Sequence, residues 1–384
     1  MKKKILILVN TLSFLISHRI DIIKAAQEKG YDVVVAYGEL GNVKKSILSK
    51  NGIDCFQVLL KRRSINPFKE LWSFFSICRI FYKLKPDIVH LITIKAYLYG
   101  GIAARLTRVP GVISAIAGLG IFFNKKNWSN LFFQKIFYFI FYLAFRHPNQ
   151  KVIVQNLEDK KTLIKFIALN SKKILLFRGS GVKLSKFTNL KEENNVITIC
   201  CASRLLYEKG IFDFVSAARI IKKKNINAKF LLAGDLDLDN PTSLNDQDLQ
   251  NIIEEKVVEV LGYQKDIPAL YARSHIICLP SFYGEGLPKA LIEAAAASRA
   301  VVTTDIPGCR DAIISNKTGL LVPVKDPQKL ADTLEWLIKH HDERIAMGKA
   351  GRKFAEKEFS IEKIVQNHLN IYQELLIQDK PKQF

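Results

Sequence analysis

Two glutamates and two cations in the second half of the chain have the types and spacing to bind an anionic ligand. Glu285 and Glu293 lie eight residues apart in the segment Pro280–Ala294, and Arg204 and Lys209 follow an apolar run. Two cations and a helix N-terminus together can neutralise a diphosphate. A ligand that lies along such a helix could contact one carboxylate at each end.

The segment that holds the first glutamate predicts a glycine-flanked loop that leads into a helix. Gly284 and Gly286 let the backbone approach a ligand closely. Pro288 suits the first turn of a helix, so we expect the helix over Leu287–Ala297. The free N–H groups of that turn would form an anion site. If the helix held both glutamates, they would lie about 12 Å apart and within about 80° of one face.

The same arrangement predicts no metal and no cofactor, because the cations and the helix supply the positive field. The segment Asp235-Leu236-Asp237-Leu238-Asp239 has the D-x-D spacing of some metal sites. It runs directly into a stretch rich in Asn and Pro, which is typical of a solvated loop. We therefore interpret these aspartates as surface residues.

Strand-like and helix-like segments alternate through the first half of the chain, which predicts a parallel sheet covered on both faces. The expected strands are Lys4–Val9, Tyr31–Ala36, Asp87–Leu91, Gly111–Ala115 and Lys151–Val154. The expected helices are His18–Lys29, Pro67–Leu84, Ile94–Leu106 and about Trp128–Phe145.

A second alternating series begins after a polar stretch, and we place the domain boundary near residue 190. Its expected elements are strands Val196–Ala202, Lys229–Ala233, Ile276–Leu279 and Ala300–Thr304, with helices Ile211–Lys222 and Leu287–Ala297. The fold class is therefore α/β, with Rossmann-like domains over 1–190 and 191–360 that face each other across a cleft. Residues 361–384 are expected to form a helix that packs back on the first domain.

The net charge of +22 is confined to the first half of the chain. Residues 1–190 contain 32 Lys and Arg against 9 Asp and Glu, whereas the remainder contains 26 against 27. Such segregation indicates a surface that meets a polyanion, and nucleic acid, anionic lipid and phosphate-rich substrates are all candidates.

Nothing in the sequence indicates a membrane-spanning or secretory segment. The apolar run Ile5–Val9 is too short for a signal peptide, so we expect a cytoplasmic protein. The six cysteines lack C-x-x-C spacing and several lie in apolar runs, which predicts reduced core thiols.

The chain resembles the family 4 retaining glycosyltransferases of the GT-B fold, most clearly from Val196 to Gly319. The resemblance is closest to the group that builds capsule, O-antigen and lipid-linked oligosaccharides. The segment Thr318-Gly319-Leu320-Leu321 resembles a structural turn of the family. The E-x7-E element that Glu285 and Glu293 form is the family's signature.

The resemblance also implies a role for each residue of the second half. Glu285 would hold hydroxyls of the donor sugar, Glu293 would bind the nucleotide ribose, and Arg204 and Lys209 would bind the diphosphate. The residues expected to line the donor site are Gly284, Gly286, Leu287, Pro288 and Tyr263, and the expected donor is a UDP-sugar.

The first half departs from the family pattern at two positions. The second His of an H-x-H motif is replaced by Ile92, and a His found before Gly-Leu-Gly is replaced by Ala117. Family members are thought to let the leaving phosphate take the acceptor proton, so activity does not require these histidines. The remaining candidates for an acceptor site are Asn10, His18, Arg19, His90 and Lys95, although His90 also fits a buried core histidine.

An aromatic stretch, Leu131–Phe145, is apolar on nearly every face and too short to span a bilayer. A buried helix is one interpretation, and a helix that presents aromatics to a membrane interface is the other. Support for the second, as a partly buried helix, comes from the aromatic helix that contains Trp72 and from nearby Lys125, Lys126, Trp128 and Lys61-Arg62-Arg63.

The sequence therefore predicts a retaining, metal-independent glycosyltransferase that acts at the inner face of the cell membrane. It would move a hexose or N-acetylhexosamine from a UDP-sugar to a polyprenyl-diphosphate-linked glycan acceptor. A UDP-sugar 2-epimerase on the same fold is one alternative, although it would need a more acidic or His-rich reaction centre. A basic nucleic-acid-binding protein is the other, but the basic residues are spread over many elements and no recognised nucleic-acid module is present.

Overall fold

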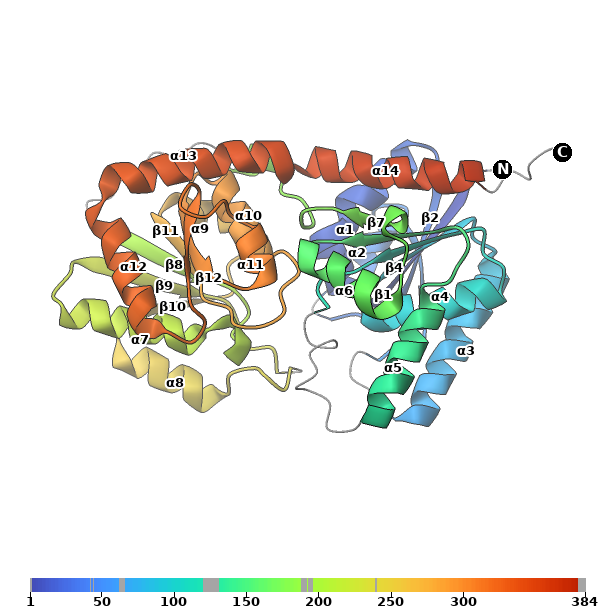
Figure 1. Cartoon of the computed structure of the whole chain (residues 1–384), viewed down its shortest axis with the longest axis horizontal. Coiled ribbons are helices and arrows are strands. Elements are labelled where there is room, and N and C mark those ends of the chain that lie inside the picture. Colours follow the sequence, from blue (N-terminus) through green and yellow to red (C-terminus); the bar gives the residue numbers. More distant parts are fainter. Residues whose placement is uncertain are drawn as a thin grey trace. The chain divides into compact units, whose positions relative to one another are not determined.

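A computed structural model describes residues 2–41, 43, 45–61, 66–119, 131–187, 192, 196–238 and 240–378, without the side chains of 131–134 and 378. The chain divides into two compact units (Figure 1). The first comprises Met1–Ser180 with Glu362–Phe384, and the second comprises Gly181–Ile361. The boundary expected near residue 190 lies outside the described residues.

The first unit is built on a seven-stranded parallel sheet in the order β3-β2-β1-β4-β5-β6-β7. Its strands are β1 (Lys4–Thr11), β2 (Asp32–Glu39), β3 (Asp54–Gln57), β4 (Ile88–Ile92), β5 (Gly111–Ala115), β6 (Gln150–Val154) and β7 (Ile174–Leu176). Its helices are α1 (Leu12–Glu28), α2 (Ser46–Ser49), α3 (Pro67–Leu84), α4 (Ile94–Leu106), α5 (Leu131–Ala144), α6 (Leu157–Ile167) and α14 (Ile361–Gln378).

Alternate residues of β1 show how both faces of this sheet are buried. Leu6 and Leu8 join one core cluster, with residues of α3, α4, α5 and α6. Ile5 and Ile7 join the other, with residues of α1 and α14. Successive side chains of a strand point to opposite faces, so a strand covered on both sides reads as an unbroken apolar run.

The second unit is built on a six-stranded parallel sheet in the order β10-β9-β8-β11-β12-β13. Its strands are β8 (Ile197–Ala202), β9 (Ala228–Ala233), β10 (Glu259–Gly262), β11 (Ile276–Leu279), β12 (Ala300–Thr304) and β13 (Gly319–Val322). Its helices are α7 (Ile211–Lys223), α8 (Asp246–Glu255), α9 (Ile267–Ala272), α10 (Lys289–Ala296), α11 (Pro307–Asp311), α12 (Pro327–Lys339) and α13 (His341–Glu358).

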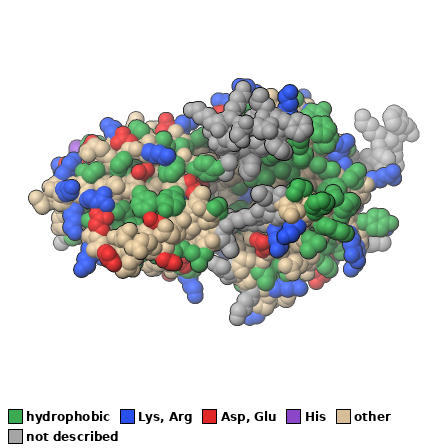
Figure 2. Space-filling view, turned by 90° about the horizontal axis from the view of Figure 1, so that it is seen from below, with side chains coloured by type: hydrophobic (Ala, Val, Ile, Leu, Met, Phe, Trp, Pro, Cys, Tyr) green, Lys and Arg blue, Asp and Glu red, His purple; other side chains and the backbone are tan. Residues whose placement is uncertain are grey.

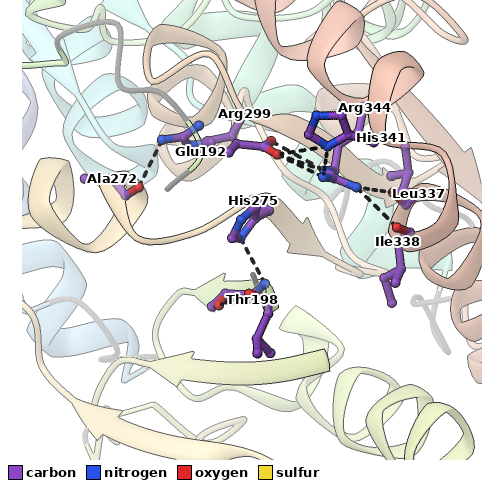
Figure 3. A network of polar contacts seen from close by, with 10 residues as sticks. Glu192, Thr198, Ala272, His275, Arg299, Leu337, Ile338, His341 and Arg344 are labelled. Atoms are coloured by element: carbon purple, nitrogen blue, oxygen red, sulfur yellow. Dashed lines mark hydrogen bonds and ion pairs between the residues drawn. The ribbon is translucent and has the colours of Figure 1, made fainter. Parts of the chain in front are cut away.

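Two fully buried arginines of this unit are satisfied by fixed partners (Figure 3). Arg344 donates from Nη2 to the carboxylate of Glu192 at 2.9 Å and from Nη1 to the carbonyl of Leu337 at 2.7 Å. Arg299 donates from Nη2 to the carbonyl of Ala272 at 3.0 Å. Because each buried charge has hydrogen-bond acceptors, we assign both arginines to the scaffold.

The structure confirms two parallel-sheet α/β units. Two helices begin at other residues than the sequence predicted. α1 begins at Leu12, directly after β1, so His18 and Arg19 lie within the helix and do not open it. α10 begins at Lys289, two residues later than expected. Among the described residues, no helix combines the length and apolar composition needed to cross a bilayer. All six cysteines are free thiols, and burial raises the pKa of Cys201 and Cys309 to about 12.

Candidate active site

The predicted donor residues of the second unit gather at the point where the sheet order reverses. β8 lies between β9 and β11, so the chain crosses to opposite sides of β8. Open parallel sheets bind ligands outside the carboxyl ends of their strands at such a switch point. Arg204 and Lys209 follow β8, and Glu285 follows β11, so three predicted residues meet at this edge.

Lys209 and Glu285 form a partly shielded ion pair across the switch point. Each side chain is 15% exposed, so solvent screens the pair less than at an open surface. The Oγ of Ser281 lies 2.9 Å from Glu285 Oε1 and 2.9 Å from the carbonyl oxygen of Glu208. Its single hydroxyl proton can be donated to one of these two oxygens at a time. Hydrogen bonds from described residues to this carboxylate all use Oε1, which leaves Oε2 available to a ligand.

Two glycines that the sequence analysis did not single out fix the loops around this pair. Gly210 has a φ of +72°, and a Cβ there would lie 2.0 Å from the carbonyl oxygen of Pro280. A Cβ on Gly308 would lie 2.1 Å from the carbonyl oxygen of Gly286 and 2.5 Å from that of Glu285. These loops pack backbone against backbone, which holds Glu285 in place.

The loop before α10 corrects the helical spacing that the sequence predicted. Pro288 is the N-cap residue of α10, so Glu285 lies in the loop and only Glu293 lies in the helix. The distance and angle calculated for two residues on one helix therefore do not apply. Leu287 is buried in the hydrophobic core, and neither Gly284 nor Gly286 has a positive φ.

Glu293 is a mostly buried carboxylate in the middle of α10. Its Oε1 lies 3.7 Å from the Nζ of Lys289. Burial raises the pKa of Glu293 above its ordinary value, and the charges of Lys289 and Lys186 oppose that shift. A buried carboxylate leaves the folded protein less stable than a buried apolar residue would. Its presence at this position is therefore typical of a binding residue.

We expect Glu293→Gln to weaken UDP binding by roughly 10- to 100-fold, because a hydrogen bond to a charged group contributes about 1.5–3 kcal/mol. The substitution removes a charge whose burial is unfavourable, so the melting temperature of the free protein should not fall. Calorimetric titration with UDP measures the affinity. Equal UDP affinity in wild type and variant would contradict the ribose assignment.

Arg204 and Tyr263 lie at the same edge of the sheet and are more exposed. The Nη1 of Arg204 donates to Asp237 Oδ2 at 2.6 Å, and the Arg204 side chain is 51% exposed. Tyr263 directly follows β10 and is also exposed. Within the described part of the chain, no three His, Cys, Asp or Glu side chains are grouped to hold a metal ion.

The first unit has its own switch point, between β1 and β4. Asn10, near the end of β1, donates its N–H to Thr93 Oγ1 at 3.2 Å, and that hydroxyl donates to Asn10 Oδ1 at 2.6 Å. Thr93 has φ +80° and ψ 156°, a conformation that almost only glycine adopts. Strain of this kind costs about 1–3 kcal/mol and concentrates at functional sites, yet no sequence signal marks a threonine for it.

Lys95, at the start of α4, is tied to α3. Its Nζ lies 2.7 Å from Glu70 Oε1, and the hydroxyl of Tyr99 donates to Glu70 Oε2 at 2.5 Å. Burial and the Glu70 carboxylate both raise the pKa of Tyr99. Lys95 lies three residues after the end of β4, one of the two strands at the switch point.

The other predicted residues of the first unit are packed inside it or against their own helix. His90 is fully buried and its Nδ1 lies 2.8 Å from the hydroxyl of Tyr372, which favours the core-histidine alternative. Burial lowers the pKa of His90 well below its ordinary value, so it is neutral. Arg19 is buried near the same tyrosine, and burial lowers its pKa to about 10. His18 stacks on Phe14 with ring centroids 4.3 Å apart.

Comparison with known proteins identifies both halves of the chain. The family profile "Glycosyl transferase 4-like" matches residues 4–156, and the profile "Glycosyl transferases group 1" matches residues 183–354. The fold and the matched domains define the chain as a glycosyltransferase of the GT-B class. Its first half belongs to the "Glycosyl transferase 4-like" family and its second half belongs to the "Glycosyl transferases group 1" family.

Three curated relatives align over most of the chain. The N,N'-diacetylbacillosaminyl-diphospho-undecaprenol alpha-1,3-N-acetylgalactosaminyltransferase of Campylobacter jejuni is 26% identical over 93% of this chain and 95% of its own. The capsular polysaccharide biosynthesis glycosyltransferase CapM of Staphylococcus aureus is 29% identical over 89% and 92%. The UDP-Gal:alpha-D-GlcNAc-diphosphoundecaprenol alpha-1,3-galactosyltransferase of Escherichia coli is 27% identical over 82% of each chain.

Solved structures support the same fold at lower identity. A glycosyltransferase from Rickettsia africae superposes with a TM-score of 0.76 at 22% identity, over 98% of this chain and 99% of its own. HepE of Anabaena, in complex with UDP-glucose, superposes with a TM-score of 0.75 at 19% identity, over 97% and 99%.

Proposed function

We propose that this glycosyltransferase moves a hexose or N-acetylhexosamine from a UDP-sugar to a polyprenyl-diphosphate-linked glycan, with retention of configuration. The observation that carries the proposal is the grouping of Arg204, Lys209 and Glu285 at the switch point of the second sheet. Two relatives whose names specify diphospho-undecaprenol acceptors support the proposed acceptor class. Bacterial surface polysaccharide or glycoprotein glycan assembly is the setting that these relatives suggest.

The residues of the second unit supply charge and orientation for the transfer. The acceptor hydroxyl attacks the anomeric carbon on the face from which UDP leaves. The bond between that carbon and the phosphate oxygen breaks, its electrons stay on the oxygen, and the oxygen takes the acceptor proton. Arg204 and Lys209 stabilise the charge that develops on the diphosphate, and Glu285 orients the sugar.

The epimerase alternative receives less support from this site. The described partners of Glu285 are a lysine and a serine, whereas epimerisation at C2 calls for an acid–base group beside the sugar. An epimerase would also convert its nucleotide sugar without any acceptor.

A thermal-shift screen of nucleotide sugars tests the donor class. A ligand at 100 times its dissociation constant adds roughly 2.7 kcal/mol of stability. We expect at least one UDP-sugar to raise the melting temperature, and the corresponding ADP- and GDP-sugars to raise it less. Stabilisation by another nucleotide sugar alone would overturn the choice of UDP.

Chelation should leave the activity largely intact, because Arg204 and Lys209 supply the positive field. The measurement is UDP release with and without excess EDTA, using the donor and acceptor that support turnover. Loss of activity with EDTA, restored by a divalent cation, would place a metal in the mechanism.

We further propose that the first unit binds an anionic membrane surface through α3 and α5. Large apolar side chains stand exposed on both helices (Figure 2): Phe68, Leu71, Trp72, Phe75 and Tyr82 on α3, with Ile136, Phe139 and Tyr142 on α5. The opposite side of α5 contributes Phe141 and Ala144 to the core, so the buried-helix interpretation is confirmed for that side. The exposed side is the one that we assign to the membrane. An exposed aromatic surface on a strongly basic unit suits an anionic bilayer interface.

The basic residues Arg62, Arg63, Lys125 and Lys126, with Trp128, were predicted to share in this contact and lie outside the described residues. The proposed location is the inner face of the cell membrane, where lipid-linked acceptors would be reached. A lipid-linked substrate would bring both an anionic headgroup and a bilayer to this unit. An anionic membrane would account for the excess positive charge of the first unit, so the proposal does not require binding to a nucleic acid.

We expect wild type to pellet with anionic liposomes, to be released by high salt, and to ignore DNA at the same ionic strength. Replacing both Phe68 and Trp72 with Ser should weaken liposome binding at least tenfold, since each buried aromatic contributes about 1.5–3 kcal/mol. UDP affinity should not change. The matched control is Ile377→Ser, an equally exposed apolar residue on α14. Unchanged liposome binding by the double variant would refute this surface.

A further inference from the structure

The loop that follows β9 contains the D-x-D spacing, and it is bonded to the segment that carries Arg204. The N–H of Leu205 donates to the carbonyl of Asp235 at 3.0 Å, and the N–H of Tyr207 donates to the carbonyl of Thr242 at 2.8 Å. The backbone after Arg204 is therefore fixed by this loop. Among the aspartates of this loop, which were interpreted as surface residues, Asp237 is partly buried and ion-paired.

Asp237 is itself held within its loop. Its N–H donates to Ser243 Oγ at 3.0 Å, and its carbonyl accepts from the N–H of Asn240 at 2.5 Å. Its carboxylate then accepts from Arg204 Nη1 at 2.6 Å. A carboxylate with a fixed backbone restricts the guanidinium that it binds.

A glycine brings the two segments this close. Gly234 directly follows β9, has a φ of +145°, and donates its N–H to the carbonyl of Gly262 at 2.9 Å. A Cβ on Gly234 would lie 1.8 Å from the carbonyl oxygen of Ser203, beside Arg204. The backbone conformation therefore brings the two loops together, and the ion pair between Arg204 and Asp237 forms within this fixed arrangement.

We propose that Asp237 is a positioning residue that orients Arg204 toward the diphosphate of the donor. The bonds of Arg204 to described residues use Nη1 alone, which leaves Nη2 and Nε as donors for phosphate oxygens. Guanidinium groups bind phosphate through two parallel N–H donors. A guanidinium that is already oriented loses less side-chain conformational entropy when the phosphate binds. The inference rests on the proposed function and adds a residue to its donor site.

The opposite role, in which Asp237 competes with phosphate for Arg204, fits the contacts less well. A competing carboxylate must move away when the ligand binds, whereas the backbone that carries the Asp237 carboxylate is held by hydrogen bonds to Asn240 and Ser243. The Arg204 side chain is half exposed with Asp237 in place, so a ligand can reach it without displacing the aspartate. The two roles predict opposite changes in affinity.

The experiment titrates wild type, Asp237→Ala, Asp237→Asn, Arg204→Ala and the double variant Arg204→Ala/Asp237→Ala with UDP, uridine and inorganic pyrophosphate by calorimetry. Asp235→Asn is the matched control, because it removes the same charge from an exposed side chain of the same loop. Melting temperatures of the free proteins establish that each variant is folded.

We expect Asp237→Ala to weaken UDP and pyrophosphate binding about tenfold and to leave uridine binding unchanged. Asp237→Asn keeps an acceptor for Nη1 and should recover much of the loss, while Asp235→Asn should bind as wild type does. In the Arg204→Ala background, the Asp237→Ala change should have no further effect, because its partner is already gone.

Different outcomes separate this inference from the donor site itself. If Arg204→Ala weakens UDP binding and Asp237→Ala strengthens it or leaves it unchanged, the donor site stands and the positioning role is overturned. If Asp235→Asn weakens binding as much as Asp237→Ala, the effect is one of general charge and the inference fails. If wild type binds neither UDP nor pyrophosphate, or Arg204→Ala changes nothing, the donor site and the inference fall together.

Discussion

Lys209→Ala and Arg204→Ala are each expected to lower the turnover number by about 10²- to 10³-fold while the protein stays folded. Both cations follow β8, at the edge of the sheet where the leaving diphosphate would lie. A fixed charge placed where negative charge develops acts mainly on the transition state, so the loss should appear in kcat more than in KM. Steady-state rates of UDP release measure it.

Lys229→Ala provides the matched control, because Lys229 is an exposed lysine of the same unit that pairs with Glu259 at 2.7 Å. It should retain wild-type turnover. Near-normal turnover in both Lys209→Ala and Arg204→Ala would mean that the donor site has been placed on the wrong residues.

Glu285→Gln is expected to lower turnover by roughly 10- to 100-fold and to relax discrimination among donor sugars. The carboxylate accepts from Lys209 and from Ser281 through Oε1, and its Oε2 is the oxygen proposed to meet the sugar. A hydrogen bond from a neutral hydroxyl to a carboxylate contributes about 1.5–3 kcal/mol, and an amide oxygen supplies less. Competition between two UDP-sugars, with both products quantified, reports the discrimination.

The affinity for UDP without a sugar serves as the control for Glu285→Gln, and it should change much less than turnover does. The reverse pattern, with UDP affinity lost and sugar discrimination intact, would assign Glu285 to the nucleotide and not to the sugar.

Local sequence determined most of the fold because each signal lies within one element. Strands buried on both faces read as apolar runs, as in Lys4–Thr11, and the glycine-flanked loop before α10 marks a strand-to-helix junction in one short segment. Helix starts were less accurate. Thr11 is the N-cap residue of α1, but its side chain makes no capping hydrogen bond and it directly ends β1, so the sequence signal for this helix start is weak.

The contacts that refine the site join distant segments and could not be predicted from spacing. Asp237 meets Arg204 because Gly234 lets two loops approach each other, which depends on the pairing of β8 with β9. His90 meets Tyr372 on the C-terminal helix, and that contact removes the histidine from the surface.

Thr93 illustrates a different limit of prediction. A β-branched residue is among the last expected at positive φ, so only the structure reveals its strain. Its hydroxyl bonds with Asn10, a residue predicted for the acceptor site, at the switch point of the first sheet.

The most direct test of the central proposal is the structure of the product. The enzyme would be incubated with the UDP-sugar that stabilises it most and with an undecaprenyl-diphosphate-linked monosaccharide, and the new glycosidic linkage would be analysed by NMR. We predict an α linkage that keeps the configuration of the donor, formed together with one UDP for each sugar transferred. A β-linked product would contradict retention, and conversion of the nucleotide sugar to its C2 epimer without any acceptor would contradict glycosyl transfer itself.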